Sequence, residues 1–173
     1  MKKLTVILAC CIFFACNNTN TNSTGNSAST DTAAVNYPYK IDHPDYWETG
    51  SKSNTLALLS SLKAWEEGNL DESLKYFADT VLLDFNGPEM KLPNDSLKAI
   101  LAAGKANTKS VTIDMKDWES VISKDKKQEW VTVWYTQHKQ TNDGKTDSMA
   151  VINDAQFKDG KIIKLAEYTR ALH

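Results

Sequence analysis

The sequence predicts an α+β fold in which three helices pack on one face of a curved, mostly antiparallel sheet. Apolar residues recur at helical spacing over much of residues 51–104, whereas the following residues alternate in steps of two and are divided by short turns. Because the helical segments come first and most strands follow, the helices are expected to cover one side of a meander.

Three helices are expected before the meander. Leu58 and Trp65 fall on one face of the first helix, and Gly68 ends it. Asn69 then caps a second helix, because its side chain can accept a hydrogen bond from a free backbone N–H of the first turn. A third helix is expected over residues 93–104, where proline and two polar residues precede an apolar stripe.

The strand-like segments are short, rich in β-branched and aromatic residues, and bounded by turn residues. Asn142-Asp143-Gly144 and Asp159-Gly160 are typical of hairpin turns, so the last four segments should pair as antiparallel neighbours. The expected strands are residues 80–85, 110–122, 129–138, 146–157 and 161–169.

The N-terminal residues have the form of an export signal. Two lysines precede an apolar run over residues 4–15, which is shorter than the roughly 20 residues that cross a bilayer as a helix. The run ends at Ala15-Cys16 and resembles the lipobox of bacterial lipoproteins, which implies acylation of Cys16; an ordinary secretory signal is the alternative. Two or more acyl chains would anchor the protein stably, so the expected location is the bacterial cell envelope, lipid-anchored in the periplasm or at the outer membrane.

Composition divides the rest of the chain. Residues 17–36 contain six Asn, five Thr and three Ser with one charged residue, which predicts a flexible tether. The aromatic residues that follow predict an extended arm that packs on the domain. The expected organisation is therefore a signal peptide at 1–15, a tether at 16–36, an arm at 37–50 and a folded domain at 51–173.

Charge and residue content exclude several functions. The net charge is −2 and there is no basic run, so binding to nucleic acid is not expected. All three cysteines lie in the first 16 residues, and the three histidines are far apart in the sequence, so no metal site is expected in the domain. No glycine-rich phosphate loop occurs, and no cofactor is predicted.

Three strings carry a resemblance to a known superfamily. Residues 65–71 (WEEGNLD) and 76–81 (YFADTV) resemble the helix–helix–strand start of the nuclear transport factor 2-like (SnoaL-like) superfamily, and residues 157–162 (FKDGKI) resemble its final hairpin. The resemblance covers residues 51–170 and is nearest to a group of secreted bacterial lipoproteins. It implies a cone whose sheet wraps around the helices and leaves a pocket at the open end. Since the superfamily includes isomerases, cyclases, dehydratases and binding modules, the fold leaves the function open.

The steroid-isomerase branch of this superfamily implies chemical roles for three positions. Asp84 is at or beside the position of the carboxylate base, Ser61 holds the tyrosine position, and Asn153 holds the second acid position. Asn153 could still donate a hydrogen bond to a developing oxyanion. Strand alternation leaves two alternatives for Asp84: a carboxylate in the pocket, or a solvated residue on the more polar face of its strand.

One face of the strand at 129–138 carries two tryptophans, two threonines and a histidine. Matched to the superfamily, that face lines the cavity and would suit a small hydrophobic or amphipathic ligand, since pockets combine apolar walls with a few polar anchors. The alternative is ordinary core packing, with the histidine in water at the strand end. The residues concerned are Trp130, Thr132, Trp134, Thr136 and His138.

Glu167 is expected to face inward on the last strand. Burial there would raise its pKa and suit it to act as an acid or base, whereas an ion pair with Arg170 is the favoured alternative. The sequence thus predicts an anchored module that binds a small molecule or a protein, and a homodimer through the open sheet face is one form that it could take. The alternative is a small isomerase, cyclase or lyase with Asp84 or Glu167 as general base, polarised by His138 and Asn153.

Overall fold

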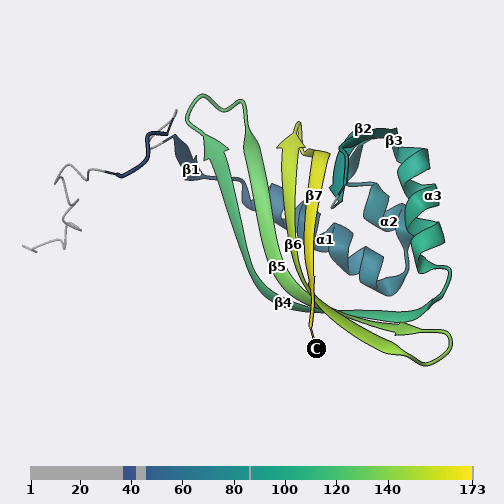
Figure 1. Cartoon of the computed structure of the whole chain (residues 1–173). Coiled ribbons are helices and arrows are strands. Elements are labelled where there is room, and N and C mark those ends of the chain that lie inside the picture. The colour runs from purple at the N-terminus through teal and green to yellow at the C-terminus, as the bar shows by residue number, and fades with distance from the viewer. Residues whose placement is uncertain (1–36, 42–45, 86, 173) are drawn as a thin grey trace, which may run out of the picture. The chain divides into compact units, whose positions relative to one another are not determined.

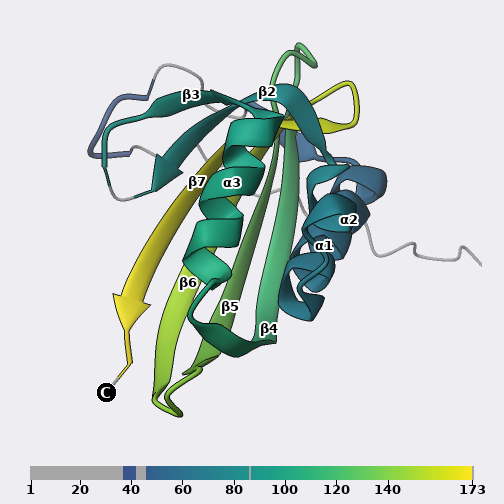
Figure 2. The same cartoon turned by 90° about the vertical axis from the view of Figure 1, so that its right-hand side faces the viewer.

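In the part of the chain that the structure describes, seven strands form one sheet, and three helices lie against one of its faces (Figure 1, Figure 2). The computed structural model describes residues 37–41, 46–85 and 87–172, and it divides into the units Met1–Ile41 and Asp42–His173; the sheet and the helices belong to the second unit. The elements are β1 (Trp47–Thr49), α1 (Lys52–Glu67), α2 (Leu70–Leu74), β2 (Phe77–Phe85), β3 (Met90–Pro93), α3 (Asn94–Lys105), β4 (Thr108–Ser123), β5 (Glu129–Thr141), β6 (Thr146–Lys158) and β7 (Lys161–Ala171).

The strand order is β1-β4-β5-β6-β7-β2-β3, and β2 pairs with β7 in parallel while every other pair is antiparallel. The register shifts between Met115 and Asp117 in β4 and between Gln156 and Phe157 in β6. Such irregularities bend a sheet and increase its twist, which fits the curved sheet in Figure 1. The predicted α+β class, with helices on one side of a curved sheet, is confirmed.

Local sequence explains most element boundaries. Ser51 caps α1, its side chain accepting from the backbone N–H groups of Ser53 and Asn54, and Gly68 ends the helix at φ +84°. Asn69 caps α2 as predicted, and the helix ends at Leu74. The strand β2 then begins at Phe77, three residues before the predicted strand at 80–85. The short strands β1 and β3 were not predicted, because three or four residues carry too little alternation to be recognised.

The core lies between the helices and the inner face of the sheet, meaning the face toward the helices. On β5 the inward side chains include Val131, Val133 and Tyr135, of which the two valines are fully buried. Leu58 of α1 and Leu97 of α3 close the core from the helix side. Every second residue of β5 therefore faces the helices, and the residues between them form the outer face of the sheet.

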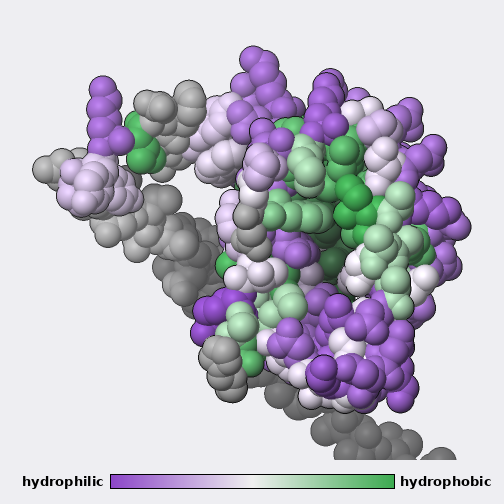
Figure 3. All heavy atoms as spheres, turned by 45° about the vertical axis from the view of Figure 1, so that its right-hand side comes forward, coloured by the Kyte–Doolittle hydropathy of each residue, from purple (hydrophilic) through white to green (hydrophobic). Residues whose placement is uncertain are grey.

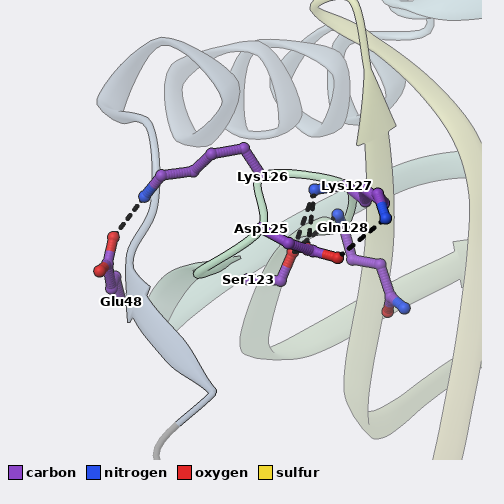
Figure 4. A network of polar contacts seen from close by, with 6 residues as sticks. All are labelled: Glu48, Ser123, Asp125, Lys126, Lys127 and Gln128. Carbon is purple, nitrogen blue, oxygen red and sulfur yellow. Dashed lines mark hydrogen bonds and ion pairs between the residues drawn. The ribbon is translucent and has the colours of Figure 1, made fainter.

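The strand β1 joins the sheet beside the β4–β5 turn (Figure 4). Within the turn, Ser123 donates to Asp125 at 2.6 Å and accepts from the backbone N–H groups of Lys127 and Gln128. The hydrogen bond from Ser123 holds the pKa of Asp125 well below its usual range, and the backbone N–H of Lys127 adds to this. Lys126, at φ +59° in the same turn, pairs with Glu48 of β1.

The N-terminal predictions concern a part of the chain that the structure does not cover. The signal peptide, Cys16 and the tether belong to residues 1–36, which lie outside the described residues. Across the part of the chain that is described, no helix combines the length and apolar character needed to cross a membrane.

Candidate functional site

A cavity of about 150 Å³ lies between α1, α3 and the inner face of the sheet. This volume is smaller than the roughly 300–1,000 Å³ typical of sites for drug-sized ligands, so it suits a small molecule. Figure 3 shows one face of the molecule with a hollow. Hydrophobic residues surround the hollow, and hydrophilic residues lie farther out. Most of the cavity wall is apolar, from the side chains of Leu58, Leu62, Trp65, Phe77, Phe85, Leu101 and Leu165.

Three hydrogen-bonded side chains from neighbouring strands form the polar end of the cavity. The Tyr135 hydroxyl on β5 donates to Oδ1 of Asn153 on β6 at 2.8 Å, and Nδ2 of Asn153 donates to Oε2 of Glu167 on β7 at 3.0 Å. The register brings them together, since Glu167 lies directly opposite Asn153 across the β6–β7 pair. The three residues are therefore held in line across the floor of the cavity.

Burial fixes the roles of these groups. Asn153 is 1% exposed and uses its carbonyl and its amide in the two hydrogen bonds, so its orientation is set by its neighbours. Burial, and then the charge of Glu167, raise the pKa of Tyr135 above its ordinary value, so the hydroxyl keeps its proton. The carboxylate of Glu167 has no hydrogen-bond partner besides Asn153 among the described residues, which leaves Oε1 able to accept a proton or a hydrogen bond.

The helix side of the cavity has a second polar pair that is satisfied internally. Ser61 of α1 is 4% exposed and its hydroxyl donates to the backbone carbonyl of Ser73 at 3.0 Å. On the sheet side of the cavity, Nε2 of Gln137 on β5 is directed to the sulfur of Met149 at 3.8 Å. Neither group carries a charge, so Glu167 dominates the electrostatics of the cavity.

One wall residue is held in place from outside the cavity. The Lys105 amine lies 4.3 Å from the centroid of the Trp65 ring and donates to the backbone carbonyl of Trp65, at the end of α1. Burial lowers the pKa of this amine below its ordinary value. Lys105 lines a separate hollow with Glu66 and Glu67, so its charge is not part of the cavity wall.

The structure brings together two of the predicted site residues, Asn153 and Glu167. The favoured pair of Glu167 with Arg170 is wrong, because an odd number of steps along β7 separates them: Glu167 lines the inner cavity and Arg170 lines a hollow on the outer face. Asp84 also lies away from the cavity. Its strand turns Val81 and Leu83 inward, and Asp84 lies near Lys164, whose pKa is raised by Glu89 and, to a smaller degree, by Asp84.

The face of β5 expected to line the cavity is the outer face. The residues between the predicted ones, Val131, Val133 and Tyr135, point inward. The predicted set is therefore turned away from the helices. Two of that set line an outer hollow of about 430 Å³, and the exposed histidine bonds Ser148 at 2.8 Å through Nδ1. The residues to which this correction applies are Trp130, Trp134, Thr136 and His138.

Tyr135 and Gln137 take the place of that set in the cavity wall. The signal that identifies them is the hydropathy of the two faces: Val131, Val133 and Tyr135 make the more apolar side of β5, and the more apolar side of a half-buried strand normally faces the core. The resemblance places a tyrosine at the position of Ser61 on α1, whereas here the tyrosine hydroxyl reaches the cavity from β5.

Solved structures share this architecture at low sequence identity. A nuclear transport factor 2-like protein of unknown function from Burkholderia pseudomallei is 12% identical, with a TM-score of 0.57 over 69% of this chain and 92% of that chain. A candidate polyketide cyclase from Xanthomonas campestris pv. campestris is 16% identical, with a TM-score of 0.52 over 68% and 90%. An LEH-like epoxide hydrolase from Mycobacterium tuberculosis is 12% identical, with a TM-score of 0.56 over 69% and 84%.

These comparisons establish the fold and nothing finer: the domain has the nuclear transport factor 2-like fold, as the sequence predicts. No protein-family model and no curated protein matches the chain.

Proposed function

We propose that this protein is a lipid-anchored envelope lipoprotein whose domain binds a small, largely apolar molecule. The observation that carries the binding function is a cavity with apolar walls and one hydrogen-bonded polar end, formed by Tyr135, Asn153 and Glu167. Apolar walls supply affinity, and a small number of fixed polar groups supplies orientation. Asn153 acts here as the residue that positions the Glu167 carboxylate.

The envelope location rests on the sequence of the first 16 residues. The lysines after Met1, the apolar run and Ala15-Cys16 together support export followed by acylation of Cys16. The Asn- and Thr-rich residues 17–36 then connect the anchor to the domain. At roughly 5–6 Å × √n, a flexible tether of about 20 residues spans about 25 Å on average.

A small enzyme is the second candidate, and one observation favours it. The Glu167 carboxylate lies in a cavity with a free oxygen, and a fixed tyrosine and amide accompany it. Such an arrangement allows Glu167 to take a proton from a bound molecule as general base, with Asn153 holding the carboxylate in position. The fold is compatible with both functions, since polyketide cyclase and epoxide hydrolase are named among structures that share it.

A homodimer is a further part of the proposal. Trp134, Ile152 and Tyr168 lie directly opposite one another across three neighbouring strands, on the outer face of the sheet. Ile152 is 37% and Tyr168 54% exposed, so a second copy that covered this row would remove its apolar surface from contact with water.

Native mass spectrometry of the protein purified from its host tests these functions. We expect a co-purified small molecule that is retained under native conditions and released on denaturation. The same spectra give the oligomeric state, which we expect to be a dimer. Glu167→Gln should reduce the bound fraction, because the fixed carboxylate loses its charge. An empty wild-type protein under all purification conditions would contradict the binding function.

The same molecule separates binding from catalysis. If the domain is an enzyme, wild-type protein converts the released molecule or its precursor, and Glu167→Gln does not. Unchanged recovery of the molecule after incubation with wild-type protein supports the binding module.

A further inference from the structure

We propose that the cavity selects a small cation, an ammonium or substituted amine on an apolar body, over a neutral or anionic molecule of the same size. The inference rests on the proposed ligand-binding function and assigns the chemical class of the ligand. Three features of the cavity carry it: the sign of its charge, the direction of its hydrogen bonds, and its aromatic wall.

The charge of the cavity comes from one side chain. Glu167 is half-buried and is the one carboxylate among the lining residues, which include no lysine, arginine or histidine. The nearby amine of Lys105 lines a separate hollow, where it lies beside Glu66 and Glu67. A carboxylate that is partly removed from water is stabilised by a cation at hydrogen-bond distance and destabilised by a second anion, so the cavity favours a cation.

The hydrogen bonds within the cavity lead toward Glu167. Tyr135 donates its one proton to Asn153, and Asn153 donates to Glu167. The proton of Ser61 is used in the bond to the Ser73 carbonyl. The Ser73 hydroxyl also lines the cavity and lies 3.2 Å from Ser61 Oγ, so the hydroxyl protons are used within the wall, while Oε1 of Glu167 remains an acceptor. An ammonium group has donors and no acceptor, and therefore complements this arrangement; a carboxylate ligand has acceptors and no donor.

The aromatic content of the wall points the same way. Phe77, Phe85 and Tyr135 line the cavity beside Trp65, whose ring already has the Lys105 amine over one face. The face of an aromatic ring carries negative charge density, so it attracts cations as well as hydrocarbon, and cages of aromatic side chains recognise substituted ammonium groups. Aromatic walls alone would bind an apolar molecule of any charge. Together with Glu167, they add a preference for the cation.

Three probes of matched size and different charge test the inference on the purified full-length chain: benzylamine, benzyl alcohol and benzoate, measured by isothermal titration calorimetry at neutral pH. We expect benzylamine to bind at least about tenfold more tightly than benzyl alcohol, because an ion-paired hydrogen bond is stronger than a neutral one, and benzoate to bind most weakly. Glu167→Gln should remove the preference for benzylamine while benzyl alcohol still binds, which also shows that the variant is folded.

The control is the same substitution elsewhere. Glu119 is exposed on β4, opposite Thr132 on the outer face, so Glu119→Gln should leave all three affinities within about twofold. Equal binding of the three probes, or tighter binding of benzoate, would overturn the cation inference and leave the ligand-binding function in place. Failure of all three probes to bind would overturn both.

Discussion

Tyr135 illustrates how a single buried hydroxyl organises the site. It is 4% exposed, and its hydroxyl donates to Oδ1 of Asn153, which in turn orients Glu167. Because the folded state keeps the tyrosine protonated, its hydrogen bond should contribute to stability as well as to the geometry of the carboxylate.

Tyr135→Phe should lower the free energy of unfolding by about 1–2 kcal/mol at neutral pH, since it leaves Oδ1 of buried Asn153 without a donor. The pKa of Tyr135 is raised in the folded state above its ordinary value of 10.0, so the stabilisation it gives is present below pH 10.0. Above that pH the unfolded chain releases the proton while the folded protein retains it, and the wild type loses stability as pH rises.

Denaturant titrations at neutral pH and above about pH 10 measure this effect. The difference between wild type and Tyr135→Phe should narrow at the higher pH, and a constant difference would contradict the argument. Tyr168→Phe is the control: its ring is 54% exposed on the outer face, and its effect should stay below about 0.5 kcal/mol.

At the same scale, sequence reasoning identified Glu167 and Asn153 and missed Tyr135. Inward orientation on β7 identified Glu167, and the superfamily resemblance identified Asn153. On β5 the resemblance placed Trp130 and Trp134 on the face toward the cavity. The opposite face of the strand, with Val131 and Val133, is the more apolar one and is the face that points inward. Two large aromatic residues therefore do not identify the inward face of a strand when smaller apolar residues fill the opposite face.

At the scale of elements, β1 depends on one glycine. Gly50 N–H donates to the Ser120 carbonyl at 2.8 Å, and a Cβ at Gly50 would lie 2.3 Å from Ser120 Oγ and 2.9 Å from the Val121 nitrogen. The hydroxyl can rotate away, but the backbone nitrogen cannot, so a side chain at this position forces β1 and β4 apart.

Gly50→Ala should therefore loosen β1 and lower stability by about 1–3 kcal/mol. Amide hydrogen exchange is the direct measurement, because the Lys124 N–H donates to the Tyr46 carbonyl and should exchange faster once β1 separates. Gly104→Ala is the matched control. Gly104 lies in α3 with nothing within 4 Å of an added Cβ, so there alanine should stabilise by up to about 1 kcal/mol. Unchanged exchange at Lys124 in Gly50→Ala would show that β4 accommodates the methyl group.

The long elements could be predicted because each repeats its signal. The cap at Ser51, the stop at Gly68 and the Asp159-Gly160 turn with φ of +51° and +74° all follow local rules, and the structure has them. The strands β1 and β3 have three and four residues, which is too short for a pattern to be recognised; β1 owes its conformation to pairing with the distant strand β4, and β3 to pairing with its neighbour β2.

At the scale of the whole molecule, the order of helices and strands was sufficient for the fold, whereas the anchor depends on the chain before the domain. Cys16→Ser should move most of the protein from the membrane fraction to the soluble envelope fraction, because acylation requires the thiol and two or more chains are needed for stable anchoring. Fractionation with immunoblotting measures this. Cys10→Ser, in the same apolar run, should leave the protein in the membrane fraction; release by Cys10→Ser instead would move the acylation site.

The docking of β1 also determines how mechanical load enters the domain. Among the described residues, the first to pair with the sheet are the three of β1, at its edge, so a pull on the chain before them acts on this pairing. An edge strand pulled from its end opens one hydrogen bond at a time, so β1 should yield at low force. The next point of resistance is Ser51, whose N–H bonds Glu129 at 2.8 Å while its side chain caps α1. Under tension, β1 would thus separate from β4 before the force acts on α1, the helix that forms one wall of the cavity.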